Sequence, residues 1–113
     1  MNPLEIININ DFTIVKAINT LTIFDIENLS NPLPEIPENT KGVIIDLSKT
    51  EEIDSFGISI IVRLISLCKS NNKKFGVVVS NNKVLYILKI DRLDKILPLY
   101  KSIEEALENL KNN

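Results

Sequence analysis

The sequence predicts an α/β domain with a mostly parallel central sheet, an antiparallel N-terminal hairpin, and helices packed on the sheet. Three observations support this prediction. Two strand-like stretches open the chain, strand and helix patterns alternate after them, and two later strands are continuously apolar, as in strands buried on both faces. With 113 residues, the chain is expected to form one domain, 1–113, around a single core.

The first half of the chain is expected to contain three strands. Residues 4–10 and 12–18 are strand-like and flank an Asn-Asp turn, so they predict a hairpin. A short helix is expected at 22–30, and the proline-rich segment 31–37 is expected to be irregular because each proline restricts the backbone. The continuous apolar run 42–47 predicts a strand buried on both faces.

The second half of the chain is expected to alternate between helices and strands. Helices are expected at 57–70, 81–90 and 102–110, and strands at 75–79 and 96–100. The last helix has a sequence signature for its start, because a serine followed three residues later by a glutamate forms a capping box. The two residues are Ser102 and Glu105.

Composition argues against several classes of function. The chain has no histidine, the commonest general base and zinc ligand, and its one cysteine, Cys68, cannot form an internal disulfide. No apolar run is long enough to span a bilayer, and residues 1–5 lack the pattern of a signal peptide. We therefore expect a cytoplasmic, non-enzymatic protein with no cofactor, no metal and no membrane insertion.

Charge is distributed unevenly along the chain. The net charge of −2 gives no reason to expect nucleic-acid binding. Residues 1–60 carry 3 basic and 10 acidic side chains, whereas residues 61–113 carry 10 basic and 5 acidic ones. This asymmetry is either ordinary solvation or a polarised surface that steers a protein partner.

The helix expected at 57–70 has more apolar surface than one sheet face requires. Its polar side chains fall in one narrow stripe, and the apolar side chains cover over half of its circumference. A neighbouring helix could bury the surplus. Alternatively, Ile60, Leu64 and Leu67 could form an exposed patch that docks a partner.

The stretch Glu51-Glu52-Ile53-Asp54-Ser55-Phe56-Gly57 lies between the buried strand and this helix. The Ser55 hydroxyl stands where it could cap the helix, and Asp54 could do the same with a charge that suits the helix dipole. A hydrolase that uses Ser55 is not expected, because the chain offers no suitable base. Ser55 is therefore either a helix cap or a substrate of another protein.

In its order of buried strand, short acidic loop, Asp-Ser-x-Gly motif and broadly apolar helix, the chain resembles the STAS domain family. Within that family it is most similar to the single-domain anti-sigma factor antagonists of bacteria. The resemblance covers nearly the whole chain, and its specific motif is Asp54-Ser55-Phe56-Gly57. It implies a STAS-like fold.

The resemblance also implies a phosphorylation switch at Ser55. In the family, the equivalent serine is phosphorylated by a partner that is both an anti-sigma factor and a serine kinase. The unmodified form binds that partner, and a phosphatase for the phosphorylated form resets the switch. Asp54 and Gly57 would shape the loop that presents Ser55, and we expect them to form the partner-binding surface with Phe56, Ile60 and Leu64.

The chain departs from the family pattern near the motif. Phe56 stands where the family usually has a small hydroxyl residue, Gly57-Ile58-Ser59 replaces the common Gly-Leu-Gly, and the usual acidic residue is replaced near Thr22. Phe56 could serve as an interface anchor or pack in the core.

Two other classes of function remain open. One is a STAS module without a switch, acting as a scaffold or as an accessory subunit of a transporter or lipid-handling complex, in which Ser55 is only a cap. The other is a phospho-aspartate receiver, because the strand that ends at Asp46 and Leu47 resembles the one that carries its acceptor. A receiver also needs an acidic pair after its first strand to hold Mg²⁺, and Asn8-Ile9-Asn10 offers none.

Overall fold

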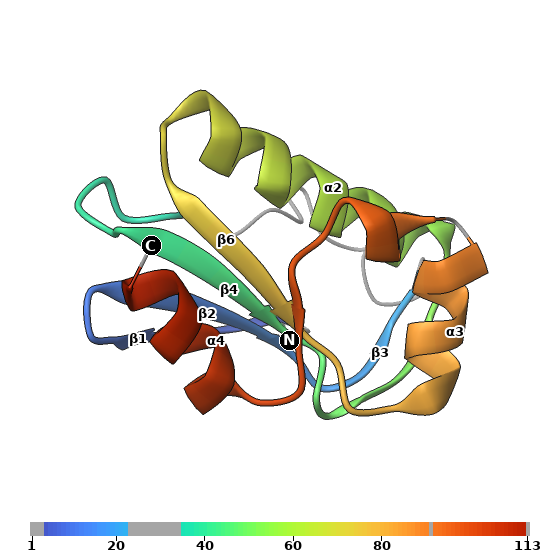
Figure 1. Ribbon diagram of the computed structural model, residues 1–113. Coiled ribbons are helices and arrows are strands. Elements are labelled where there is room, and N and C mark those ends of the chain that lie inside the picture. The colour runs from blue at the N-terminus through green and yellow to red at the C-terminus, as the bar shows by residue number, and fades with distance from the viewer. Residues whose placement is uncertain (1–3, 23–34, 91, 113) are drawn as a thin grey trace.

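The computed structural model describes residues 4–22, 35–90 and 92–112. A five-stranded sheet in the order β1-β2-β4-β6-β7 forms its centre (Figure 1), and every neighbouring pair is parallel except β1 and β2. This confirms the predicted α/β fold with a mixed sheet. The strands are β1 (Leu4–Ile9), β2 (Phe12–Ala17), β4 (Gly42–Asp46), β6 (Lys74–Val78) and β7 (Leu99–Tyr100).

Among the described residues, three helices cover the two faces of this sheet. α2 (Ser55–Ser70) and α3 (Asn82–Ile90) contribute buried side chains to the larger part of the core, together with one face of β2, β4 and β6. α4 (Ile103–Lys111) packs on the opposite face and closes a smaller cluster with the alternate residues of the same strands. The alternation follows from the period of two along each strand, and both faces of β4 are buried as its apolar run predicts.

The N-terminal hairpin is confirmed, with a two-residue turn. Both turn residues have positive φ, 49° at Asn10 and 70° at Asp11, as a type I′ turn requires. Asparagine and aspartate tolerate this left-handed conformation better than most residues. The turn holds β1 and β2 in an unbroken antiparallel register from Leu4 opposite Ala17 to Ile9 opposite Phe12.

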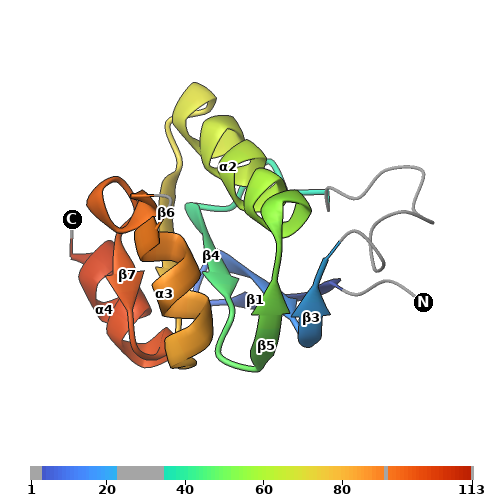
Figure 2. The ribbon, with the colours of Figure 1, turned by 90° about the vertical axis from the view of Figure 1, so that its right-hand side faces the viewer.

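A second, smaller sheet was not predicted from the sequence. β3 (Asn19–Leu21) and β5 (Thr50–Ile53) form a parallel pair beside the main sheet (Figure 2). The acidic stretch before the Asp-Ser pair is therefore mostly strand, and the expectation of an acidic loop there was wrong. The buried Thr50 hydroxyl donates to the Ala17 carbonyl at 2.7 Å, which ties this pair to the end of β2.

The C-terminal part follows the predicted order with shifted boundaries. The strand expected at 96–100 is reduced to β7, and a 3₁₀ turn, η1 (Leu93–Lys95), precedes it. The helix expected at 22–30 lies outside the described residues except for Thr22, as does most of the proline-rich segment. No helix in the described ranges is long and apolar enough to cross a bilayer.

Candidate functional site

The first turn of α2 is capped by Asp54, not by Ser55. Asp54 has extended backbone geometry, and its Oδ1 accepts hydrogen bonds from the Phe56 N–H at 3.0 Å and the Gly57 N–H at 3.1 Å. Its carbonyl accepts the first helical bond, from the Ile58 N–H, also at 3.0 Å. A carboxylate here satisfies two unpaired N–H groups and places negative charge at the positive end of the helix dipole.

Ser55 is consequently the first residue of the helix, and its side chain is exposed. Among the described residues, no hydrogen bond engages its hydroxyl. The next serine on the same face behaves differently, because the Ser59 hydroxyl donates to the Phe56 carbonyl at 2.6 Å. Of the two hydroxyls in the first two turns, the one at Ser55 is available to another protein.

Gly57 allows the start of α2 to approach the small sheet closely. A Cβ at this position would collide with the carbonyl oxygen of Leu21 in β3 and would lie 2.7 Å from Cγ1 of Ile53 in β5. The Asp54 N–H also donates to the Leu21 carbonyl, at 3.4 Å. Figure 2 shows β5 leading directly into this first turn. The turn that presents Ser55 is thus packed against two strands.

The exposed side of α2 differs from the predicted one. Ile60 is 3% exposed and Leu64 is 1% exposed, so the expectation that these two side chains form a surface patch was wrong. Leu67 is exposed, and so is Phe56, at 48%. Ile60 and Leu64 are buried because α2 packs on the small sheet as well as on β4 and β6, so two sheets together cover the surplus apolar surface.

The surface side of the first half of α2, here called the docking face, combines hydroxyl, apolar and basic groups. At 100° per residue its members follow one another along one side of the helix. Val62, which is exposed although the sequence suggests a core position, belongs to this side. The docking face consists of Ser55, Phe56, Ser59, Val62 and Arg63.

Three acidic residues lie close in the sequence to the start of the docking face. Glu51 and Glu52 project from β5 and are exposed, and Asp54 is half-buried at the cap. An added phosphate on Ser55 would therefore add to the negative charge of this short segment. Its three oxygens would also lie at a helix N-terminus, which favours negative charge.

Comparison with known proteins identifies the family. Residues 4–106 match the STAS domain. This chain belongs to the STAS domain family. The solved structures it resembles include a candidate anti-sigma factor antagonist from Thermotoga maritima, with a TM-score of 0.79 at 26% identity over 96% of this chain and 94% of that one. An anti-sigma factor antagonist from Mycobacterium paratuberculosis has the same fold, with a TM-score of 0.78 at 20% identity over 96% and 92% of the two chains.

Curated sequences give a consistent picture. A Thermotoga maritima protein named as a candidate anti-sigma factor antagonist is 35% identical to this STAS domain over 69 residues. A homologue from Thermotoga neapolitana is 36% identical over the same length. The match spans 61% of this chain and 61% of the length of each of these relatives.

The single thiol of this STAS domain is a core group. Cys68 is 2% exposed, and burial raises the pKa of its thiol, although the nearby Lys73 charge opposes the shift. A neutral thiol is a poor nucleophile and a poor metal ligand. Within the described ranges, no three acidic, histidine or cysteine side chains cluster in a way that could hold a metal ion.

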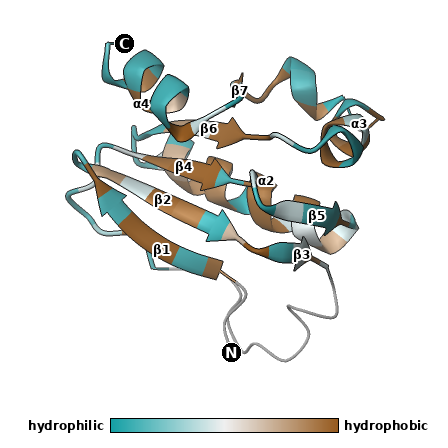
Figure 3. Cartoon of the chain, turned by 90° about the horizontal axis from the view of Figure 1, so that it is seen from below, coloured by the Kyte–Doolittle hydropathy of each residue, from teal (hydrophilic) through white to brown (hydrophobic). Residues whose placement is uncertain are grey.

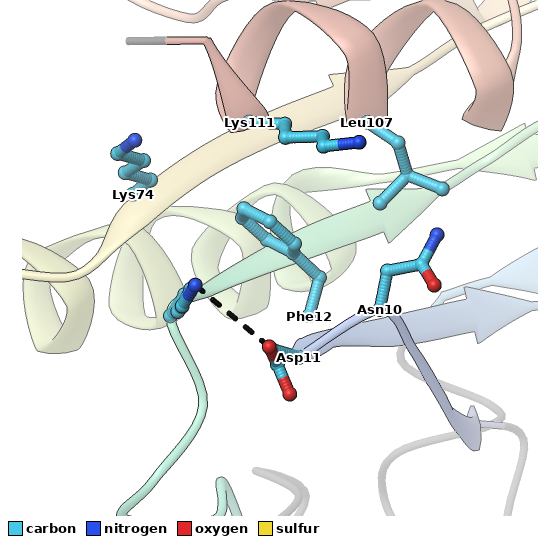
Figure 4. Close-up of a pocket in the computed structure, with 7 residues that line it drawn as sticks. Asn10, Asp11, Phe12, Lys74, Leu107 and Lys111 are labelled. Atoms are coloured by element: carbon cyan, nitrogen blue, oxygen red, sulfur yellow. Dashed lines mark ion pairs between the residues drawn. The ribbon is translucent and has the colours of Figure 1, made fainter.

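A cavity of about 300 Å³ lies at the opposite end of the STAS domain, at the amino ends of β2, β4 and β6 (Figure 4). Two of the three lysines that line this cavity already have partners. The Lys74 ammonium donates to the Leu110 carbonyl at 2.7 Å, and Lys41 forms an exposed ion pair with Asp11 at 3.7 Å. The length of α2, about 24 Å for a helix of this size, separates the cavity from Ser55, so it is not part of the docking face.

Proposed function

We propose that this STAS domain is an anti-sigma factor antagonist whose binding is switched at Ser55. In this proposal the unmodified protein binds an anti-sigma factor that is also a serine kinase, and phosphorylation of Ser55 releases it. A phosphatase acting on the phosphorylated form completes the cycle in the cytoplasm. The protein itself acts by binding and performs no chemistry.

The observation that carries the proposal is the exposed Ser55 hydroxyl. A serine at a helix start is commonly a cap, and Asp54 fills that role here. The hydroxyl of Ser55 is therefore not needed to hold the helix. The names of the Thermotoga proteins support the same function by relationship.

Phe56 is the expected anchor of the complex. It is an aromatic side chain next to the serine, and it is 48% exposed in the free protein. Aromatic side chains contribute disproportionately to protein interfaces when they become buried. Phe56 gives a partner an apolar contact adjacent to the proposed phosphorylation site, and the exposed Val62 adds a second one nearly two turns farther along the docking face.

Phosphorylation would weaken this complex through charge and hydration. A phosphoserine adds roughly −1.5 to −2 charges at neutral pH. It would add to the negative charges of Glu51, Glu52 and Asp54 in the segment that leads into the helix, so the start of the docking face would become strongly negative. A partner that buries Phe56 would then also have to desolvate the phosphate, which opposes binding.

The first experiment locates the modification. The protein is incubated with ATP and its cognate kinase, and phosphate is assigned by mass spectrometry. We expect phosphate on Ser55 and none on Ser59, whose hydroxyl already donates to a backbone carbonyl. Phosphate on another residue, or on none, contradicts the proposal.

The second experiment tests whether a negative charge weakens partner binding only when it is placed at Ser55. Ser55→Ala should keep partner affinity and resist phosphorylation, whereas Ser55→Asp should weaken binding by about tenfold or more, because a charge is introduced at the interface. Ser66→Asp is the matched control, since it adds the same charge to an exposed position three turns along α2. Equal effects of Ser55→Asp and Ser66→Asp would show that the partner does not use the start of the helix.

Phe56 also motivates the alternative function. Its size at a position where the family usually has a small residue is compatible with a scaffold or an accessory subunit that does not switch. In that case Phe56→Ala weakens the complex and Ser55→Asp leaves the affinity unchanged. Binding measurements with these two variants therefore distinguish the two functions.

A further inference from the structure

The two edges of the main sheet are built differently. β7 is two residues long, and α4 packs against it. β1 is six residues long, and its main contacts are with β2 (Figure 3). A short or covered edge is protected from pairing with another strand, whereas a long open edge presents unpaired backbone groups.

The backbone hydrogen bonds show which groups of β1 point outward. In a hairpin with a two-residue turn, the residues that flank the turn, here Ile9 and Phe12, form a hydrogen-bonded pair, so the odd-numbered residues of β2 direct their backbone groups toward β4. The even-numbered residues of β2 therefore pair with β1, and the register places Ile7 opposite Ile14. By the alternation of an antiparallel ladder, Ile6 and Asn8 direct their N–H and C=O groups away from the sheet.

Within the described residues, the outer side of β1 lacks several of the features that usually prevent association. It contains no proline and no lysine, and its register with β2 has no bulge. Two large apolar side chains, Ile6 and Ile7, are each 41% exposed and project from opposite faces of the strand. An open edge of this kind is typical of a site where another strand adds to the sheet.

We propose that β1 pairs antiparallel with β1 of a second copy of this chain and joins the two sheets into one. A two-fold axis at Ile7 would place Ile6 opposite Asn8 of the other copy, so that all the outward backbone groups of these residues become paired. The two Ile7 side chains would meet on the face that α4 partly covers. The same edge is thus complementary to itself, as a two-fold interface requires.

Charge is compatible with this register. Glu5 is the only charged residue of β1, and it lies opposite Lys16 in the hairpin. In the proposed pair, the two Glu5 residues would be about 14 Å apart, given the spacing along and between strands. Like charges that face each other directly oppose strand pairing, and this register contains no such pair.

The test measures mass against concentration for the full chain by light scattering and sedimentation. We expect a species of twice the 12.8 kDa monomer mass at high concentration. Ile7→Lys would bring two ammonium groups together at the axis and should weaken association by at least about tenfold. Val62→Lys is the matched control, because Val62 has the same 41% exposure but lies on the docking face.

A second measurement tests the register. Amide hydrogen exchange should show Ile6 and Asn8 protected at high concentration and unprotected in the Ile7→Lys monomer. A wild-type protein that remains monomeric at about 1 mM, or Val62→Lys and Ile7→Lys variants that dissociate equally, would overturn the proposal. Pairing through β1 does not depend on the proposed switch at Ser55. Ile7→Lys should weaken self-association and leave partner binding intact, whereas Val62→Lys should impair partner binding.

Discussion

Two helices of this STAS domain begin near a serine, and the two serines have different roles. At the start of α4, the Ser102 hydroxyl accepts from the Glu105 N–H at 3.1 Å, which is an ordinary N-cap. At the start of α2, the cap is Asp54, and Ser55 is one residue inside the helix with an exposed hydroxyl. Ser102 occupies the N-cap position and stabilises the fold, whereas Ser55 lies one position farther into its helix and does not.

The comparison teaches that a serine near a helix start is a modification candidate when a neighbour performs the capping. The aspartate of the Asp-Ser pair caps the helix, and the serine hydroxyl is exposed and takes no part in the cap. Four substitutions test this division of roles. They are ordered from the largest expected loss of stability to the smallest.

Gly57→Ala should destabilise the protein most, by about 3 kcal/mol, because the added methyl collides with a backbone carbonyl of β3 that cannot move aside easily. Urea unfolding monitored by circular dichroism measures this loss. Gly76→Ala is the control, since its Cβ would meet the Tyr100 ring at 2.8 Å, and a side chain can rotate away. Equal costs for both variants would show that α2 does not rest tightly on the small sheet.

Asp54→Ala should cost about 1–2 kcal/mol, because the variant loses a cap that accepts two hydrogen bonds and a charge that favours the helix dipole. Unfolding in urea gives the value. Asp54→Asn keeps an acceptor in place and should retain most of the stability. If Asp54→Ala left the free energy of unfolding unchanged, another group, such as the Ser55 hydroxyl, would have replaced Asp54 as the cap.

Ser102→Ala should cost about 1 kcal/mol, the usual cost of removing a serine cap. The same unfolding experiment applies, with Ser66→Ala as an exposed helical serine that caps nothing. If the loss at Ser102 were no larger than at Ser66, the two helix starts would not differ in the way the structure indicates.

Ser55→Ala should change stability by no more than about 0.5 kcal/mol, as expected for an exposed position without partners. Its effect should appear instead in phosphorylation assays with the cognate kinase. A stability loss near that of Ser102→Ala would assign Ser55 to the fold and would remove the main support for a switch at this residue.

Long, regular patterns in the sequence predicted the fold well. The apolar run at β4, the apolar helix α2 and the two-residue turn of the hairpin each carry a local signal that matches their final environment. The family resemblance, which rests on the Asp54-Ser55-Phe56-Gly57 motif, was confirmed by the STAS match over residues 4–106.

The small sheet could not be predicted in the same way. β3 has three residues and β5 has four, and Glu51 and Glu52 give β5 the composition of a loop. These strands exist because Leu21 and Ile53 are buried against α2, which is a contact between distant parts of the chain. Tertiary packing, not local preference, decides such short strands.

The same contact explains the error on α2. A helical pattern shows how much apolar surface a helix has, but it does not show how many neighbours cover it. Ile60 and Leu64 are buried because a second sheet lies against the helix, and only Phe56, Val62 and Leu67 among its large apolar side chains are clearly exposed. The capping residue was also left open, since Asp54 and Ser55 both suit a helix start.

The cap at Asp54 has a consequence for the lifetime of the protein in a cell. Proteases degrade mainly the unfolded fraction, which is set by the free energy of unfolding. Because the Ser55 hydroxyl contributes to no hydrogen bond within the described residues, a phosphate added there breaks none. The helix N-terminus favours the added charge and the nearby carboxylates oppose it, so we expect that free energy to change little. If Ser55 is switched as proposed, the modified and unmodified forms should therefore be degraded at similar rates, so that their ratio would report the opposing kinase and phosphatase activities and not differential turnover.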